Sequence, residues 1–159
     1  MKRLPLTKGK EAVVDDTDYR FANRWKWTLH TKGYAYRRVR QDDKQTVVWL
    51  HRVIAERAGI GIGIKGRYID HSDRNPLNCR RSNLRAATNS QNLANRGKNR
   101  NNTSGRKGVT WDKSRHKWMA QIMVQGRVFY LGRHSKRDAA YAAYLAASYE
   151  HFGEYAYAE

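Results

Sequence analysis

The chain has 159 residues, and its 32 Lys and Arg against 14 Asp and Glu give a formal net charge of +18 at pH 7. A surplus this large predicts a polyanionic partner, because an unneutralised chain would repel itself. The single cysteine, Cys79, excludes a disulfide framework and a cysteine-based zinc cluster. No apolar run of about 18 residues and no signal peptide is visible, so we expect a cytoplasmic, nucleoid-associated protein that is not secreted and has no membrane partner.

The first part of the chain is expected to be a mixture of strands and short helices. Aromatic and β-branched residues predict strands at 24–29, 33–40 and 45–50. A short helix at 51–58 and a strand at 67–71 follow, and 73–81 has the composition of a loop. Thr88 and Gln91 have the spacing of a capping box, which predicts a helix that carries Asn92 and Asn95.

The stretch 96–106 contains no apolar residue and is rich in Asn and Gly. This composition predicts a flexible basic linker, residues 97–106, between two domains at 1–96 and 107–159. The basic side chains at this break are expected to follow the DNA backbone: Arg96, Lys98, Arg100 and Arg106.

The last part of the chain has a cleaner pattern. Strands are predicted at 107–112, 116–125 and 127–133, and apolar residues occupy every second position of the middle one. Ser135 and Asp138 begin a helix that runs to about residue 151, and Gly153 is a plausible stop. We therefore predict three antiparallel strands packed on one helix, and an α+β fold for the whole chain.

Four polar residues in the first domain suggest chemistry on a phosphodiester. Asp70 can supply a hard oxygen ligand to Mg²⁺ or Mn²⁺, and Asn92, on the predicted helix, a second one. His71, neutral near pH 7, can take a proton from an attacking water. Asn83 can hold a loop, because its amide can bond backbone on both sides of a turn.

The order and spacing of these residues resemble the HNH homing endonucleases of phages and introns, in the variant that ends its motif in Asn. The likeness rests on LHR at 50–52, DHSDRN at 70–75, RSNLR at 81–85, Thr88 and QN at 91–92. It implies a ββα-metal core with one divalent ion, held by Asp70 and Asn92. His71 would be the general base and Asn83 the structural asparagine. Asn95 could replace Asn92, and His51 could reach the phosphate or anchor its helix.

The last domain resembles the plant ethylene-response-factor (APETALA-type) DNA-binding domain. The likeness rests on KGV at 107–109, KWMAQI at 117–122, LG at 131–132 and the alanine-rich helix. In that family the sheet lies in the major groove and the helix packs behind it. Alternation then turns these side chains towards the helix: Trp118, Ala120, Ile122, Phe129 and Leu131.

The opposite face and the first turn are expected to contact DNA. The candidates are Lys107, Thr110, Lys113, Arg115, Lys117, Met119, Gln121, Met123 and Tyr130, with Arg127 and Arg133 at phosphates. Few arginines stand where guanine would be read, so the sequence preference is expected to be loose or to use other residues.

The sequence as a whole predicts a divalent-metal-dependent DNA endonuclease. It would act as a monomer on double-stranded DNA, without a small-molecule cofactor, and nick one strand per active site. A non-catalytic DNA-binding regulator with a decayed nuclease core is the main alternative, and the intact Asp70, His71, Asn83 and Asn92 argue against it. A second alternative is an RNA-binding protein, which only the charge and the aromatic residues support. A colicin-like toxin is disfavoured, because no translocation segment is visible.

Overall fold

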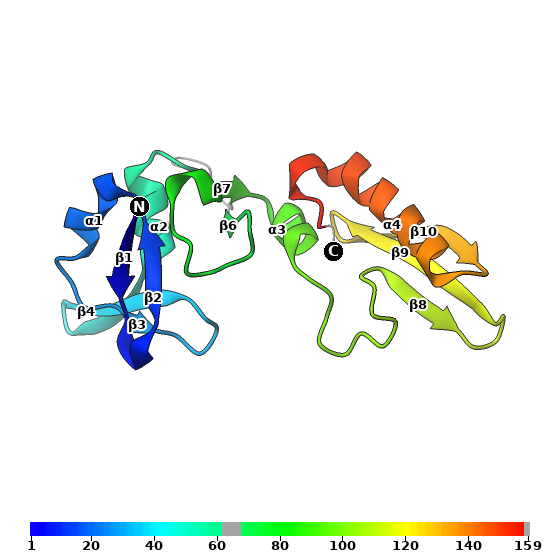
Figure 1. Ribbon diagram of the computed structural model, residues 1–159, viewed down its shortest axis with the longest axis horizontal. Helices are drawn as coiled ribbons and strands as arrows, with labels where there is room; N and C mark the ends of the chain where they lie inside the picture. Colours follow the sequence, from blue (N-terminus) through cyan, green and yellow to red (C-terminus); the bar gives the residue numbers. More distant parts are fainter. Residues whose placement is uncertain (62–67, 158–159) are drawn as a thin grey trace. The chain divides into compact units, whose positions relative to one another are not determined.

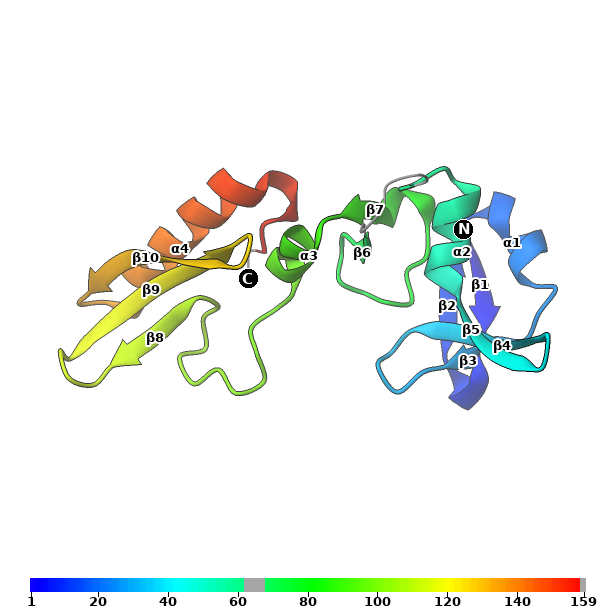
Figure 2. The ribbon, with the colours of Figure 1, turned by 180° about the vertical axis from the view of Figure 1, so that it is seen from behind.

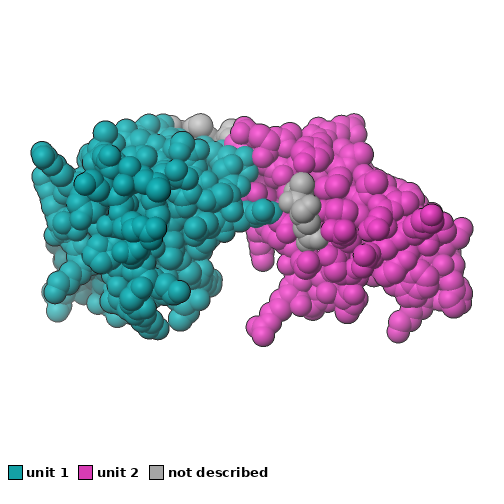
Figure 3. Space-filling model, viewed as in Figure 1, with its two compact units in different colours: residues 1–87 teal, residues 88–159 magenta. Residues whose placement is uncertain are grey.

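The computed structural model describes residues 1–61 and 68–157 and divides into two compact units (Figures 1 and 3). Unit 1 comprises residues 1–87 and unit 2 comprises residues 88–159. Both units combine helices with antiparallel sheets, so the predicted α+β class is confirmed.

Unit 1 begins with elements that the sequence did not suggest. Strands β1 (Lys2–Pro5) and β2 (Glu11–Val14) pair antiparallel around the short 3₁₀ turn η1 (Thr7–Gly9), and helix α1 (Asp16–Ala22) follows. Strands this short, of four residues each, carry too little periodicity to be recognised.

The middle of unit 1 matches its prediction closely. Strands β3 (Thr28–Leu29), β4 (Ala35–Gln41) and β5 (Lys44–Trp49) form a sheet in that order, and helix α2 (Leu50–Arg57) continues from β5. The predicted strand at 24–29 is thus reduced to its last two residues. Trp27 is buried instead, and its indole N–H donates to the carbonyl of Ala22 at 2.8 Å.

The core of unit 1 lies between the sheets and α2. Its most deeply buried apolar side chains are Leu4, Val14, Trp27, Leu50 and Ile54. A second hairpin, β6 (Tyr68–His71) and β7 (Leu84–Ala87), closes the unit, with the 3₁₀ turn η2 (Arg81–Asn83) just before β7. The predicted strand at 67–71 is confirmed over the four residues of β6; residue 67 lies outside the described residues.

Unit 2 has a three-stranded antiparallel sheet in the order β10-β9-β8, formed by β8 (Val109–Asp112), β9 (Lys117–Val124) and β10 (Arg127–His134). Helix α4 (Arg137–Phe152) packs along one face of this sheet and ends in the turn η3 (Gly153–Tyr155) (Figure 2). The predicted three strands under one helix are confirmed. Gly108 has φ +72°, and a Cβ there would lie 2.0 Å from the Tyr144 ring, so glycine is required.

Helix α3 (Asn89–Asn95) belongs to unit 2, where Ala94 joins the core. The stretch 97–106, predicted as a linker, also lies in unit 2. Ser104 is buried in it, and Asn102 donates to the carbonyl of Arg106 at 3.0 Å. The compact units divide at 87/88, and the domains predicted from the sequence, 1–96 and 107–159 with a linker at 97–106, stay a prediction.

Candidate functional site

The β6–β7 hairpin carries the Asp-His pair at the end of β6. Asp70 lies opposite Arg85, and His71 lies opposite Leu84. Asp70 and His71 are both buried, at 7% and 5% exposure. The Asp70 carboxylate accepts a hydrogen bond from Nε of Arg85 at 3.0 Å. Such an ion pair orients the carboxylate, because the planar guanidinium holds a fixed geometry.

Asn83 ties together the two ends of the loop between β6 and β7. Its side-chain Oδ1 accepts from the backbone N–H of Asp73 at 3.0 Å, and its Nδ2 donates to the carboxylate of Asp73 at 2.9 Å and to the carbonyl of Asn78 at 2.8 Å. Its own carbonyl accepts from the N–H of Ser72 at 2.8 Å. These contacts are those expected of an asparagine that fixes the loop directly after His71.

Asp73, the first residue of the predicted loop at 73–81, is a second centre of hydrogen bonding in this loop. Its carboxylate accepts hydrogen bonds from the N–H of Asn75 at 2.8 Å and from Nδ2 of Asn78 at 2.6 Å, besides that from Asn83. Burial alone would raise the pKa of Asp73, but these hydrogen bonds outweigh it and lower the pKa below its ordinary value. The loop thus keeps a fixed negative charge near His71.

His71 lies in a cluster of aromatic rings. Its ring centroid is 5.1 Å from that of His51 on α2 and 5.8 Å from that of Tyr34, just before β4. Burial lowers the pKa of His71, while the charges of Asp73 and Asp70 act in the opposite direction. The net shift keeps the imidazole neutral at pH 7, the form that a general base requires.

His51 lies on the first turn of α2, where it is buried beside His71. Burial, with smaller contributions from the charges of His71 and Arg52, lowers the pKa of His51 to about 3. The Tyr34 ring lies 5.2 Å from its ring. His51 is therefore neutral under ordinary conditions and contacts the general-base candidate from the α2 side.

Acid is expected to destabilise unit 1 through His51. The pKa of its imidazole falls from the ordinary value of 6.5 to about 3 in the fold. Between these two values the unfolded chain binds a proton at His51 and the folded chain does not. The stability that the neutral His51 contributes is fully present above pH 6.5 and is lost as the pH falls below that value. Near pH 5 the loss from His51 alone should reach about 2 kcal/mol.

Urea unfolding at neutral and mildly acidic pH measures this loss. In a His51→Gln variant the difference in unfolding free energy between the two conditions should shrink by that amount. An unchanged difference would show that His51 titrates in the folded protein as it does in water.

Asn92 and Asn95, the candidate ligands beyond the hairpin, lie on α3. The predicted capping box is confirmed: Thr88 Oγ1 accepts from the N–H of Gln91 at 3.2 Å, and Gln91 Oε1 accepts from the N–H of Thr88 at 2.8 Å. Asn95 is buried, whereas Asn92 is half-buried. Because α3 is part of unit 2, the pairing of Asn92 with Asp70 stays a prediction from the sequence.

The sheet of unit 2 separates the predicted DNA contacts by face. Trp118, Ala120, Ile122 and Leu131 pack into the core on the helix side, as predicted. Phe129 pairs with Ile122 and lies on the same side, but it is 43% exposed and only its ring approaches His151 of α4. The face away from α4, called the outer face below, comprises Thr110, Asp112, Lys117, Met119, Gln121, Met123, Val128, Tyr130 and Arg133.

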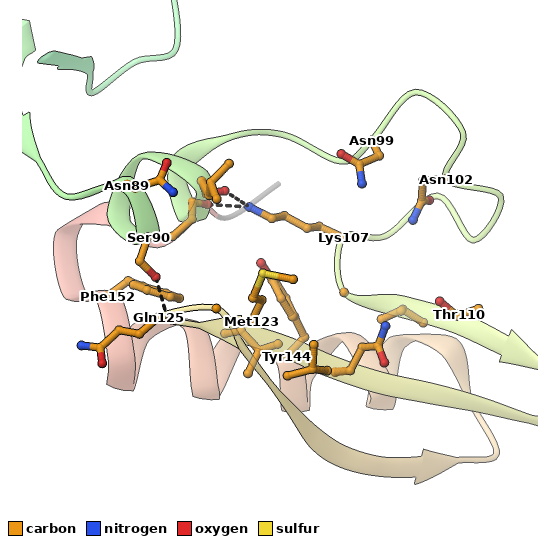
Figure 4. Close-up of a pocket in the computed structure, with 18 of the residues that line it drawn as sticks. Asn89, Ser90, Asn99, Asn102, Lys107, Thr110, Met123, Gln125, Tyr144 and Phe152 are labelled. Atoms are coloured by element: carbon orange, nitrogen blue, oxygen red, sulfur yellow. Dashed lines mark hydrogen bonds between the residues drawn. The ribbon is translucent and has the colours of Figure 1, made fainter. Parts of the chain in front are cut away.

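Two of the predicted DNA contacts have other surroundings. Lys107 donates to the carbonyls of Leu93 and Ala94 at 3.1 and 2.6 Å (Figure 4). It also donates to the carbonyl of Arg96 at 2.6 Å. It therefore caps the end of α3, where carbonyls lack helical partners. Arg127 pairs with Val124 and so lies on the helix side of the sheet.

The remaining predicted cations lie around the loop and the turn. Arg106 stacks on the Tyr141 ring at 4.8 Å, and Lys98 donates to the carbonyl of Gly105 at 3.2 Å. Arg96, Arg100, Lys113 and Arg115 are exposed. They can meet phosphate without displacing any packed side chain.

Comparison with known proteins identifies both halves of the chain. Residues 48–94 match the family "HNH endonuclease", and residues 104–150 match the family "AP2 domain". An uncharacterized HNH endonuclease of Acanthamoeba polyphaga mimivirus is 31% identical over 149 residues, which cover 94% of this chain and 74% of the viral protein. The chain belongs to the HNH endonuclease family.

A further relative of this HNH endonuclease-family chain is "Protein 3.8" of Escherichia phage T7, 44% identical over 63 residues. That match covers 40% of this chain and 52% of the phage protein, so it spans about half of that relative. No solved structure matches the chain. The HNH match takes in the β6–β7 hairpin and most of α3, and the AP2 match takes in the sheet of unit 2 and most of α4.

The predicted family is thus confirmed, together with an endonuclease domain and a DNA-binding domain in one chain. Among the helices in the described part of the chain, none is long and apolar enough to cross a membrane.

Proposed function

We propose that the chain is a divalent-metal-dependent DNA endonuclease that nicks one strand of duplex DNA per active site. The observation that carries this proposal is the buried Asp70–His71 pair at the end of β6, which is followed by a loop that Asn83 fixes through the backbone N–H of Asp73. A general base needs to be neutral at the working pH, and the lowered pKa of the buried His71 supports that role.

The donor set suits a hard cation. Asp70 offers carboxylate oxygen at the end of β6, and Arg85 orients that carboxylate through the ion pair at Oδ2. Mg²⁺ and Mn²⁺ prefer such oxygen ligands, and an amide oxygen from Asn92 would complete the protein's share of the site. One divalent ion bound there would stabilise the negative charge that develops on the phosphate and on the leaving oxygen.

Each residue of the proposed site then has its own role. The neutral His71 imidazole takes a proton from the attacking water, whose oxygen forms a bond to phosphorus while the bond to the leaving oxygen breaks. Asn83 and Asp73 hold the backbone of the loop after His71. Arg85 holds the carboxylate of Asp70.

The AP2 domain supports DNA as the substrate. With the charge of +18, its sheet and basic turn would position the duplex for the nuclease site. A single active site cuts one strand, so a monomer on DNA should nick.

Incubation of supercoiled plasmid with Mg²⁺, Mn²⁺ or EDTA tests the proposal. Metal-dependent open-circular product is the expected result, and linear product would instead indicate paired active sites. Tight binding without cleavage in either metal would contradict the proposal and favour a DNA-binding regulator with a decayed nuclease core.

A further inference from the structure

The outer face of the unit 2 sheet lacks an available arginine fork. All residues of β8, β9 and β10 are described, and among them Arg133 is the one arginine on the outer face. Its Nε donates to the Asp112 carboxylate at 2.7 Å. Its Nη1 donates to the Tyr130 hydroxyl at 3.0 Å, and its guanidinium lies 5.2 Å from the Tyr130 ring. Guanine is read best by an arginine that presents two parallel N–H groups to the base. Here that side chain is already held along the sheet.

The exposed centre of the outer face is made of amide and apolar side chains. Gln121 is exposed on β9, and Met123 and Val128 face each other across β9 and β10 at 56% and 58% exposure. No charged side chain lies at these three positions. Adjacent apolar side chains that are open to solvent are a feature of surfaces that contact a partner.

A groove of about 630 Å³ extends from this centre towards α3 (Figure 4). Amide and hydroxyl side chains line its rim, and the figure shows several of them around the opening: Asn89, Ser90, Asn99, Asn102 and Thr110. Met123 and Val128 border it on the sheet side. The groove lies wholly within unit 2 and continues the chemistry of the outer face.

Amide and apolar groups match one type of base pair. In the major groove, adenine presents N6 and N7 to the two polar atoms of an Asn or Gln amide, and thymine presents a methyl group. We propose that the outer face of the AP2 domain reads A·T base pairs, with Gln121 bonding adenine and with Met123 and Val128 covering thymine methyl groups. This inference rests on the proposed binding of duplex DNA by this domain.

Charge supports DNA as the occupant of this surface. The turn from β8 to β9 carries Lys113 and Arg115, and Lys117 begins β9 on the outer face. These cations lie beside the uncharged centre of the outer face. Phosphates would therefore contact the cations, while the edges of the bases contact Gln121 and Met123.

Binding to three duplexes of equal length tests the inference, with the full chain kept in EDTA so that cleavage is suppressed. The duplexes are alternating A-T, alternating A-U and alternating G-C, and fluorescence anisotropy gives each dissociation constant at one salt concentration. Uracil differs from thymine by the methyl group alone. We expect the A-T duplex to bind about tenfold more tightly than G-C, and about fourfold more tightly than A-U for each methyl group covered.

Variants assign the preference to the residues. Gln121→Ala should reduce the preference for A-T over G-C, and Met123→Ala should reduce the preference for A-T over A-U. Gln45→Ala, which removes an exposed amide from β5 of unit 1, is the matched control and should keep all three affinities. Equal wild-type binding to all three duplexes would overturn the inference and leave the endonuclease proposal standing. Failure to bind any duplex would overturn both.

Discussion

Replacing His71 by alanine should lower the rate of single-turnover DNA cleavage by about 10² to 10⁴ while leaving the affinity for duplex DNA unchanged. The side chain is buried at the end of β6, and its lowered pKa keeps it neutral and able to accept a proton. Its loss would remove the proposed general base without removing any exposed cation that is proposed to contact phosphate. Quenched cleavage with enzyme in excess gives the rate, and anisotropy in EDTA gives the affinity.

The matched control is His151→Ala, which removes an exposed histidine from the last turn of α4. This variant should cleave at the wild-type rate. A His71→Ala variant that lost affinity as much as cleavage would contradict the general-base role and point to a contact with the DNA itself.

Replacing Asp18 by asparagine should destabilise the protein by about 3 kcal/mol. Asp18 is fully buried at the first turn of α1, and its carboxylate accepts from Nε and Nη2 of Arg81 at 2.7 and 2.8 Å and from Nε of Arg57 at 3.2 Å. Hydrogen bonds from Arg81 lower the pKa of Asp18 in spite of its burial. Asparagine would leave two guanidinium groups without the negative charge that compensates them.

This loss should also disturb the proposed nuclease site, because Arg81 lies two residues before Asn83. The backbone N–H of Arg81 donates to the Asp15 carboxylate at 2.8 Å, so the start of α1 anchors η2 through both side chain and backbone. Chemical denaturation measures the stability, and cleavage at rising temperature measures the effect on the site.

Asp16→Asn is the matched control for Asp18, because Asp16 is exposed and pairs with the N-terminal amine at 3.0 Å. A surface pair of this kind contributes little, so its loss should change stability by less than about 1 kcal/mol. Equal effects of the two variants would show that the buried cluster does not hold α1 to η2.

The sequence predicted those features that depend on near neighbours. The capping box of Thr88 and Gln91 joins residues three apart, and alternation in β9 identified the buried face of the unit 2 sheet. The Asp70–His71 pair was also found by adjacency. Each of these signals is complete within a few residues of chain.

Contacts between residues far apart in the sequence could not be predicted in the same way. Asp18 and Arg81 are 63 positions apart, and the approach of Arg85 to Asp70 depends on the register of β6 and β7. Lys107 likewise reaches back over more than ten residues to the carbonyls of Leu93, Ala94 and Arg96 at the end of α3.

A β-bulge in β10 explains the position of Arg133. Strict alternation from Phe129 would place Arg133 on the helix side of the sheet. The register shifts between Tyr130 and Arg133, which turns Arg133 to the outer face beside Tyr130. One extra residue in a strand leaves no periodic signal, so this arginine's contact with Asp112 emerges only from the structure.

The most direct test of the proposed active site compares Asp70→Ala with Asp43→Ala in the supercoiled-plasmid assay with Mg²⁺. Asp43 is exposed in the turn between β4 and β5, so its loss controls for a change of charge alone. We predict that Asp70→Ala produces no open-circular DNA, whereas Asp43→Ala nicks plasmid as the wild type does. Undiminished nicking by a folded Asp70→Ala variant would contradict the assignment of the β6–β7 hairpin as the nuclease site.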